Sequence, residues 1–260
     1  MIRYLLSEKE LKNIEYQFLD CPDLILFLDY DGTLAPFKEN PADAIPYPGI
    51  TKLLNKLISH TDTKISIITG RTLKDIKKLI NIKKIYYAGI HGMEIEDFSS
   101  PVKKIPDNLR KKIISILSKQ DLKIEDKKYA LTIHYKNSYS EKNIFKIINK
   151  IINQDIYEIM KGRKIIELRP KNYHKGKAVA YLMNKLNSNI KSMQPIVMYI
   201  GDDTTDEDAF KYLKNKKKSI SIYVKNEANL DSIADYYLNN PYEVKSFLNK
   251  LFTYIKPCIY

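Results

Sequence analysis

Short apolar runs recur along the chain at a spacing that is typical of buried strands. Residues 24–28 are apolar at every position, as expected of a strand that is covered on both faces. Similar runs follow at residues 64–68, 85–88, 194–200, 219–224 and 235–238. Between them, apolar residues recur every three or four positions, which predicts helices at residues 7–19, 49–60, 73–80 and 174–186, one ending near 214, and one at 241–254. This alternation predicts an α/β fold with a parallel sheet.

The order of the elements changes in the middle of the chain. We predict helices at residues 107–120 and 141–153, and strands at residues 122–125, 129–135, 156–160 and 164–168. These elements have their own amphipathic faces, as a separate α+β unit requires. We therefore expect a core made of residues 1–102 and 172–260, and an inserted α+β domain made of residues 103–171.

The composition is that of an ordinary folded protein, but its positive charge is concentrated in one region. Hydrophobic residues make up 44% and charged residues 29% of the 260 residues, and the formal net charge is +13. Residues 103–171 hold 18 Lys and Arg against 8 Asp and Glu, whereas the rest of the chain has 26 against 23. A basic region attracts nucleic-acid phosphates or a small phosphorylated substrate, and a compositional bias towards Lys also produces it.

The sequence shows neither a disulfide framework nor a membrane span. Cys21 and Cys258 are its two cysteines, and their separation does not match a metal-binding motif. Every apolar run is shorter than the roughly 20 residues that a membrane helix needs, and the first residues lack the pattern of a signal peptide. We expect a cytoplasmic protein that does not bind membranes.

Polar residues follow three of the predicted strands, where parallel sheets build their sites. Asp29 and Asp31 follow the first strand, and the single residue between them places both on one side of an extended chain. Thr69 follows the second strand, and Asp202 opens an acidic cluster after residues 194–200. Two carboxylates held this close repel each other unless a cation or a proton lies between them. Carboxylate oxygens suit Mg²⁺, although a solvated turn and a helix N-terminus also account for such acidic segments.

These motifs, in this order, resemble those of the haloacid dehalogenase superfamily of phosphatases. The matching segments are residues 29–33, Thr69, a lysine before the last motif, and residues 201–203. The resemblance implies a Rossmann-like parallel core with an inserted cap domain. It also implies that Asp29 is the nucleophile, which forms an aspartyl-phosphate, and that Asp31 is the general acid and base.

The same resemblance implies how the phosphoryl group and the metal are held. Thr69 would bind the phosphoryl group and Lys175 would steady it. Lys175 is preferred to Lys177 because it opens a predicted helix, whose N-terminus also attracts an anion. The implied magnesium ligands are Asp29, Asp31 and Asp202, with Asp203 and Asp206 orienting the groups around them.

A finer resemblance, to the trehalose-6-phosphate phosphatases, covers most of the chain. It rests on residues 69–71, 91–92, 134–135, 167–170, 174–178 and 201–207. It implies trehalose 6-phosphate as the substrate, no role in nucleic-acid binding, and a trehalose-6-phosphate synthase as a partner to be considered. The substrate-binding residues that it implies are Gly70, Arg71, His91, Gly92, Glu125, Lys127, Lys136 and Glu167.

Two positions depart from the family pattern. Lys136 stands where the family more often has Arg, and a lysine cannot make the two-pronged contact of a guanidinium. His174 stands where Asn is usual. From the residues alone, Glu125 and Lys127 fit a solvated charged turn as well as a sugar site.

Three other functions are alternatives at this point. Within the superfamily, the substrate could be sucrose phosphate or a mannosyl-phosphoglycerate. The basic insert could bind nucleic acid, although it has no zinc-ligand spacing and no aromatic RNA-binding motif. A regulator without activity is disfavoured, because every catalytic position holds a competent residue type.

Overall fold

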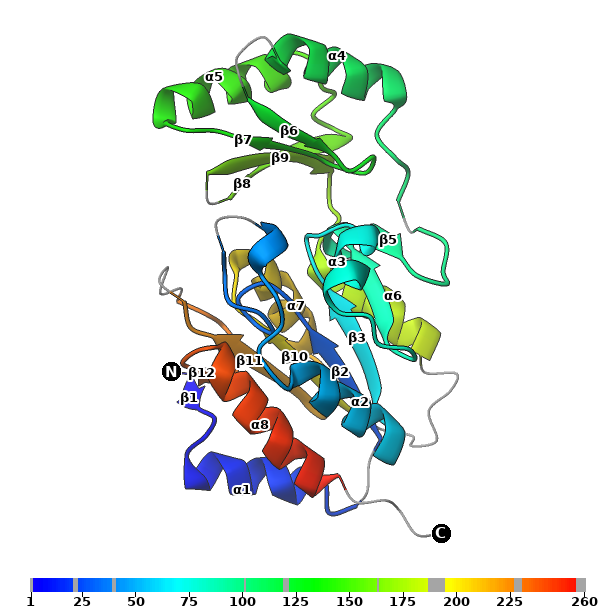
Figure 1. Cartoon of the computed structure of the whole chain (residues 1–260), viewed down its shortest axis with the longest axis vertical. Coiled ribbons are helices and arrows are strands. Elements are labelled where there is room, and N and C mark those ends of the chain that lie inside the picture. Colours follow the sequence, from blue (N-terminus) through cyan, green and yellow to red (C-terminus); the bar gives the residue numbers. More distant parts are fainter. Residues whose placement is uncertain are drawn as a thin grey trace. The chain divides into compact units, whose positions relative to one another are not determined.

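The chain forms two compact units, which we describe separately. The computed structural model describes residues 2–20, 23–38, 41–100, 102–118, 122–162, 164–186, 195–226 and 231–255. The first unit combines the residues up to 97 with those from 174 onward, and the second spans residues 98–173 (Figure 1).

The first unit is built on an eight-stranded sheet in which neighbouring strands are parallel, except for the antiparallel pair β4 and β5. The strands are β1 (Arg3–Tyr4), β2 (Leu24–Leu28), β3 (Lys64–Ile68), β4 (Tyr86–Gly89), β5 (Glu94–Ile95), β10 (Ile196–Gly201), β11 (Ser219–Val224) and β12 (Tyr236–Leu238). Their order across the sheet is β1-β12-β11-β10-β2-β3-β4-β5. β2 lies between β10 and β3 and is buried at every position, as its apolar run predicts.

Helices cover both faces of this sheet (Figure 1). They are α1 (Glu8–Gln17), α2 (Ile50–His60), α3 (Leu73–Leu79), α6 (Lys175–Leu186), α7 (Thr204–Lys214) and α8 (Pro241–Tyr254). Leu26 of β2 shares one core with apolar residues of α1, α2, α3 and α8. On the other face, Phe27 stacks on Tyr199 of β10, whose ring meets Phe210 of α7 edge-on. Successive side chains of β2 therefore serve opposite layers.

The second unit is an antiparallel sheet with helices on one face. Its strands are β6 (Lys123–Asp126), β7 (Leu131–His134), β8 (Tyr157–Gly162) and β9 (Ile165–Pro170), in the order β6-β7-β9-β8. Its helices are α4 (Asp107–Leu117) and α5 (Ser138–Asn149). Ile133 and Ile166 pack into a core with apolar residues of both helices. Residues that alternate with them, such as Thr132 and Glu167, form a polar face on the other side of the sheet.

The predicted α/β class is confirmed, with differences at the ends of elements. α5 begins at Ser138, ahead of the predicted residue 141, because the side chain of Asn137 caps it by accepting a hydrogen bond from the amide of Ser140. β1 and β5 were not predicted, since two residues are too few to show a periodicity. None of the helices in the described ranges is long and apolar enough to cross a membrane. Cys21 and Cys258 lie outside those ranges.

Candidate active site

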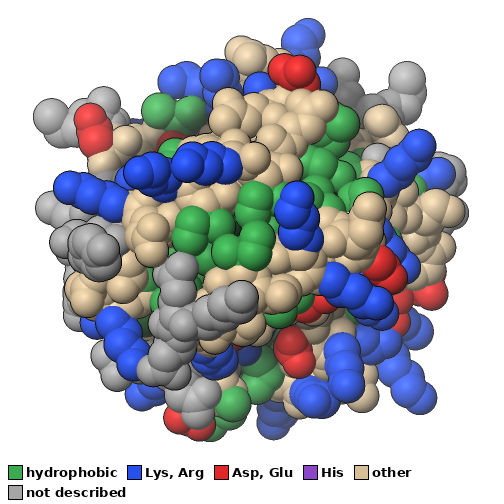
Figure 2. All heavy atoms as spheres, turned by 90° about the horizontal axis from the view of Figure 1, so that it is seen from above, with side chains coloured by type: hydrophobic (Ala, Val, Ile, Leu, Met, Phe, Trp, Pro, Cys, Tyr) green, Lys and Arg blue, Asp and Glu red, His purple; other side chains and the backbone are tan. Residues whose placement is uncertain are grey.

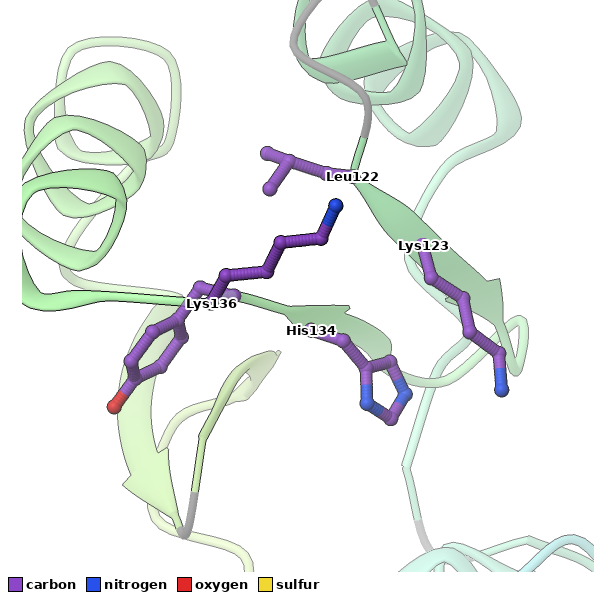
Figure 3. A pocket seen from close by; sticks show the side chains of 5 residues that line it. Leu122, Lys123, His134 and Lys136 are labelled. Atoms are coloured by element: carbon purple, nitrogen blue, oxygen red, sulfur yellow. The ribbon is translucent and has the colours of Figure 1, made fainter. Parts of the chain in front are cut away.

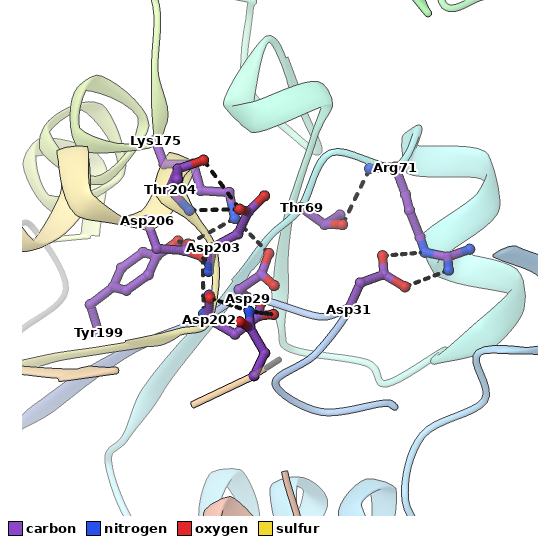
Figure 4. A network of polar contacts seen from close by, with 11 residues as sticks. Asp29, Asp31, Thr69, Arg71, Lys175, Tyr199, Asp202, Asp203, Thr204 and Asp206 are labelled. Carbon is purple, nitrogen blue, oxygen red and sulfur yellow. Dashed lines mark hydrogen bonds and ion pairs between the residues drawn. The ribbon is translucent and has the colours of Figure 1, made fainter. Parts of the chain in front are cut away.

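Three neighbouring strands of the first unit end at the same edge of the sheet, and each end carries a predicted site residue (Figure 4). β2 leads into Asp29, β3 into Thr69 and β10 into Asp202. The amide of Asp29 donates to the carbonyl of Ile200 at 2.9 Å, so the pairing of β2 with β10 continues as far as the first carboxylate. Asp29, Thr69 and Asp202 are all buried. The parallel topology thus gathers residues that are far apart in the sequence.

Lys175 lies between two buried carboxylates. It is the first residue of α6, and its Nζ donates to Oδ1 of Asp29 and to Oδ1 of Asp206, at 2.7 Å in both cases. Lys175 is 2% exposed, Asp29 4% and Asp206 0%. Burial alone would lower the pKa of Lys175, but the carboxylates of Asp206 and Asp29 outweigh it and raise this pKa above its ordinary value. Lys175 is therefore a fixed cation at neutral pH.

Asp206 accepts four hydrogen bonds on its two carboxylate oxygens. Besides Lys175, the hydroxyl of Tyr199 donates to its Oδ1 at 2.6 Å. The backbone amides of Asp202 and Asp203 donate to its Oδ2 at 3.1 and 3.0 Å. Asp203 is the N-cap of α7, and the two aspartates form a capping box. Asp206 therefore fixes both the end of β10 and the side chain of Lys175.

One carboxylate oxygen of Asp202 is available to bind a ligand. The Nδ2 of Asn226 donates to its Oδ2 at 3.1 Å and to its backbone carbonyl at 2.7 Å. Its Oδ1 is buried and has no hydrogen-bond partner among the described residues. Gly32, at a φ of 80°, leaves room for this carboxylate, since a Cβ there would lie 2.0 Å from Oδ2. Burial and the charge of Asp206 raise the pKa of Asp202 to about 7, while the hydrogen bond from Asn226 opposes that shift.

The carboxylates at the strand ends suit a divalent cation. Asp29, Asp202 and Asp206 each offer an oxygen within 4.8 Å of the others. Burial raises the pKa of Asp29 well above its ordinary range; Lys175 opposes this shift and the other two carboxylates add to it. When all three carboxylates are ionised, they exceed the single ammonium by two negative charges, and an all-oxygen donor set is the one that Mg²⁺ prefers. Asp29 and Asp202 are the better donors, because Asp206 already accepts four hydrogen bonds.

The carboxylate of Asp31, which we expected among the metal ligands, is placed elsewhere. Nε and Nη2 of Arg71 donate to its Oδ2 and Oδ1 at 2.7 and 2.5 Å. The guanidinium of Arg71 neutralises this carboxylate, and Asp31 is not among the three residues whose carboxylate oxygens lie within 4.8 Å of one another. Arg71, which we expected to bind substrate, is correspondingly engaged with Asp31.

The loops that follow β3 and β4 are held together at the same edge of the sheet. The amide of His91 donates to the carbonyl of Thr69 at 2.8 Å, and the hydroxyl oxygen of Thr69 accepts from the amide of Arg71 at 3.2 Å. The imidazole of His91 lies against Gly70, where a Cβ would come within 3.0 Å of the ring. His91 and Gly92 both have positive φ angles, which turn the chain back sharply. The substrate-binding residues predicted in the first unit therefore lie around Thr69.

Three of the four sugar-binding residues predicted in the second unit lie on the polar face of its sheet or pair with a residue there. They are Glu125, Lys127 and Glu167. Glu167 is buried, accepts a hydrogen bond from the hydroxyl of Thr132 at 3.0 Å, and pairs with Lys127 at 3.5 Å. Glu125 contacts Nε2 of His134 at 2.9 Å. The side chain of Lys127 is only 14% exposed, so the turn that carries it is not a freely solvated one.

Lys136 lines a hollow of about 370 Å³ in the second unit. The other lining residues are Leu122, Lys123, His134 and Tyr135 (Figure 3). Lys136 itself is exposed. Two lysines give this hollow a basic lining, which attracts an anionic ligand.

Two polar residues of the site were not anticipated from the sequence. Tyr199 belongs to the apolar run of β10, where it counts as one more buried position. Burial and the charges of Asp206 and Asp29 raise its pKa well above its ordinary value, so Tyr199 is a neutral donor. The signal that could have found it is that the hydroxyl of a buried tyrosine needs a partner. Asn226 follows the end of β11, and its place at a strand end is the corresponding signal.

Comparison with known sequences points to one family. Residues 27–242 match the family model described as trehalose-phosphatase. Trehalose-phosphate phosphatase B of Arabidopsis thaliana is 31% identical over 252 residues, covering 88% of this chain and 66% of that protein. Trehalose 6-phosphate phosphatase RA3 of Zea mays is 31% identical over 260 residues, covering 88% of this chain and 69% of that protein. The chain spans about two thirds of the length of these relatives.

Solved structures show the same fold. The C-terminal domain of the C. albicans trehalose-6-phosphate phosphatase superposes with a TM-score of 0.80 at 24% identity, covering 97% of this chain and 98% of that one. The Aspergillus fumigatus trehalose-6-phosphate phosphatase gives 0.68 at 23% identity, covering 97% and 99%. A phosphatase of the HAD superfamily from Bacteroides thetaiotaomicron gives 0.61 at 16% identity, covering 91% and 97%. These likenesses establish the fold of the HAD phosphatases for this chain.

Proposed function

Because the chain belongs to the trehalose-phosphatase family, we propose that it hydrolyses trehalose 6-phosphate to trehalose and phosphate. The observation that carries this proposal is the buried group at the strand ends of the first unit. There, Lys175 contacts Asp29 and Asp206, and Asp202 lies beside them. This group supports the proposal because its residues would supply a carboxylate nucleophile, a fixed cation and oxygen ligands for a metal.

The reaction would proceed in two displacements at phosphorus. In the first, an oxygen of Asp29 attacks phosphorus, the bond from phosphorus to the sugar oxygen breaks, and Asp31 gives that oxygen a proton. The phosphoryl group is then carried on Asp29. In the second, water attacks phosphorus, the bond to Asp29 breaks, and Asp31 takes a proton from the water. Both aspartates are restored at the end.

A phosphate monoester is a dianion, so the site must supply positive charge before Asp29 can approach. Lys175 would provide it through its Nζ, in the position that Asp29 and Asp206 fix. Thr69, buried at the end of β3, would position a phosphoryl oxygen. Asp29 and Asp202 would hold a magnesium ion, which would supply further positive charge to the phosphoryl oxygens.

The second unit is proposed as the cap domain that recognises the sugar. The pairing of Glu167 with Lys127, and of Glu125 with His134, supports this role because it holds charged groups in defined positions on one sheet face. The basic hollow beside Lys136 would contact the sugar phosphate as well. Lys136 offers a point charge there in place of the fork of an arginine.

Two finer proposals concern the cell. We place the enzyme in the cytoplasm, and we consider a trehalose-6-phosphate synthase as its partner, since such an enzyme makes the proposed substrate. Co-purification of the two tagged proteins would test the association.

Phosphate release from trehalose 6-phosphate, with and without Mg²⁺, tests the proposed function directly. We expect turnover only when Mg²⁺ is present. Equal turnover of sucrose phosphate and a mannosyl-phosphoglycerate would reduce the proposal to a general sugar-phosphate phosphatase. Nucleic-acid binding has weaker support, because among the described residues on the face in Figure 2 the Lys and Arg side chains are scattered and form no continuous stripe.

A further inference from the structure

The contact between Asp31 and Arg71 joins two residues to which the family resemblance gives unrelated tasks. Both oxygens of Asp31 accept hydrogen bonds from one guanidinium, at 2.7 and 2.5 Å (Figure 4). The side chain of Arg71 is 11% exposed and that of Asp31 is 31% exposed, so the guanidinium is largely shielded from water and the carboxylate is partly exposed. A two-pronged contact of this kind fixes the direction of a carboxylate as well as its position.

Arg71 is itself held from several sides. Its guanidinium lies over the ring of Tyr30, 5.4 Å from the ring centre, and the buried Tyr30 donates from its hydroxyl to the carbonyl of Ala44 at 2.7 Å. The backbone amide of Arg71 donates to Thr69, and its carbonyl accepts from the amide of Ile90 at 2.7 Å. These contacts tie Arg71 to the loops after β2, β3 and β4. Arg71 is therefore a rigid support for Asp31.

The role of this support follows from the proton transfers proposed for Asp31. An ionised carboxylate can accept on both oxygens, whereas a protonated one carries a hydrogen on one of them and is a weaker partner for a guanidinium. The two contacts made by Arg71 hold the carboxylate of Asp31 in one orientation. A base needs such an orientation when it must be aimed at the water that frees the phosphoryl group from Asp29.

We infer that Arg71 is a positioning residue that acts through Asp31 and not by gripping the substrate. This inference rests on the proposed function only in taking Asp31 as the group that exchanges protons with the sugar oxygen and with water. By fixing the direction of the Asp31 carboxylate, Arg71 would align it for the proton transfers of both steps.

A double-mutant cycle separates this role from substrate binding. The parent, Arg71→Gln, Asp31→Asn and the double variant are compared on p-nitrophenyl phosphate, whose leaving group needs no proton. We expect Arg71→Gln to lower steady-state kcat about tenfold, with KM unchanged to within about twofold, and to leave the initial burst of nitrophenolate intact. In the Asp31→Asn background the same change should cost less than about twofold.

Three controls keep the outcome clear. Arg110→Gln removes an arginine that is also 11% exposed and also paired with aspartates, and it should leave kcat unchanged. Arg71→Lys keeps the charge without the fork, so its kcat should lie between those of the parent and Arg71→Gln. Circular dichroism and thermal unfolding show whether each variant is folded.

Several results would overturn the inference. An equal loss on Arg71→Gln in both backgrounds, or a loss that appears mainly in KM, would assign Arg71 to substrate binding. An Asp31→Asn variant as active as the parent would overturn both this inference and the proposed roles of the aspartates. Because the cycle uses p-nitrophenyl phosphate, a parent enzyme that is inert towards trehalose 6-phosphate would refute the substrate proposal alone.

Discussion

The two units place their charged side chains in opposite ways. In the first unit, Asp29, Lys175 and Asp206 are buried where parallel strands end, and Lys175 bonds to both aspartates. In the second unit, polar and charged residues lie on one face of an antiparallel sheet, where direct cross-strand neighbours such as Thr132 and Glu167 bond. Few residues lie at the ends of the strands, and segments that are distant in the sequence fix their positions. Many residues lie on the face of a sheet, and the register between neighbouring strands fixes theirs.

This difference suits the two units to different tasks. Buried charges act strongly on one another because little water screens them, as chemistry at phosphorus requires. A polar sheet face can change one residue at a time without disturbing the apolar core on its other side, as recognition of a particular sugar requires. We therefore expect changes at the strand ends to affect every substrate, and changes on the polar face to affect one substrate more than another.

The largest effect should come from removing the nucleophile. Asp29→Asn is nearly isosteric but cannot attack phosphorus, so kcat should fall by a factor on the order of 10⁴ to 10⁶ on both trehalose 6-phosphate and p-nitrophenyl phosphate. Steady-state phosphate release measures the loss, and an unchanged circular dichroism spectrum shows that the fold is retained. Covalent phosphate trapped on Asp31 instead of Asp29 would reverse the assignment of the two residues.

The second effect concerns stability. Lys175→Met leaves Asp29 and Asp206 buried without their cation, and we expect the free energy of unfolding to fall by about 3 to 5 kcal/mol. Lys177→Met, two positions later on the same helix and exposed, should change it by less than about 0.5 kcal/mol. Urea unfolding of both variants measures the difference. Similar losses for the two lysines would show that the burial of Lys175 is not what matters.

The third effect concerns the metal. Magnesium at about 100 times its Kd should stabilise the parent by about 2.7 kcal/mol, and Asp202→Ala should abolish this gain. Because burial raises the pKa of Asp202 to about 7, protons compete with the cation, so affinity should weaken as the pH falls through that value. Thermal unfolding against Mg²⁺ concentration, at several pH values, measures both effects.

The partly exposed Asp208 of α7 serves as the control for the metal experiment. Asp208→Ala should respond to Mg²⁺ as the parent does, since Asp208 lies outside the three-carboxylate group. An Asp202→Ala variant that is stabilised by Mg²⁺ like the parent would exclude Asp202 as a ligand.

The smallest effect should distinguish between substrates. Glu167→Gln should lower kcat/KM for trehalose 6-phosphate about ten- to a hundredfold, since a lost hydrogen bond to a charged group costs about 1.5 to 3 kcal/mol, and leave p-nitrophenyl phosphate nearly unaffected. Glu141→Gln changes a glutamate of α5 that pairs with Lys161, and it should leave the ratio of the two substrates unchanged. Equal losses on both substrates for Glu167→Gln would mean that Glu167 serves the reaction common to both substrates and not recognition of the sugar.

Much of the first unit could be predicted from the sequence, because its fold depends on local patterns. The apolar run of β2 and the helical spacing of α2 are properties of a few consecutive residues. The rule that parallel strands end at one edge then brings Asp29, Thr69 and Asp202 together without knowledge of any contact. Similar reasoning placed Lys175 at the start of a helix.

Pairing between side chains could not be predicted in the same way. The contact of Asp31 with Arg71 depends on how two loops pack, and no spacing of residues encodes it. The hydroxyl of Tyr199 meets Asp206 only because α7 starts where β10 ends. The sequence shows which charged residues lie near the site, whereas packing determines which of them form hydrogen bonds with one another.

The pairing of β2 with β10 also determines when the site can form during synthesis of the chain. Leu24 lies beside Ile196, so the central pair of the sheet, and with it the approach of Asp29 to Asp202, must wait until the ribosome has released the later strand. The second unit is continuous in sequence and has its own core, so it can fold while β10 is still unmade. The proposed recognition domain would then exist before the catalytic site, and the nascent chain would carry the unpaired β10-facing edge of the apolar strand β2 throughout that interval. Chaperone binding to β2, measured on ribosomes stalled before β10 is made, would reveal this delay.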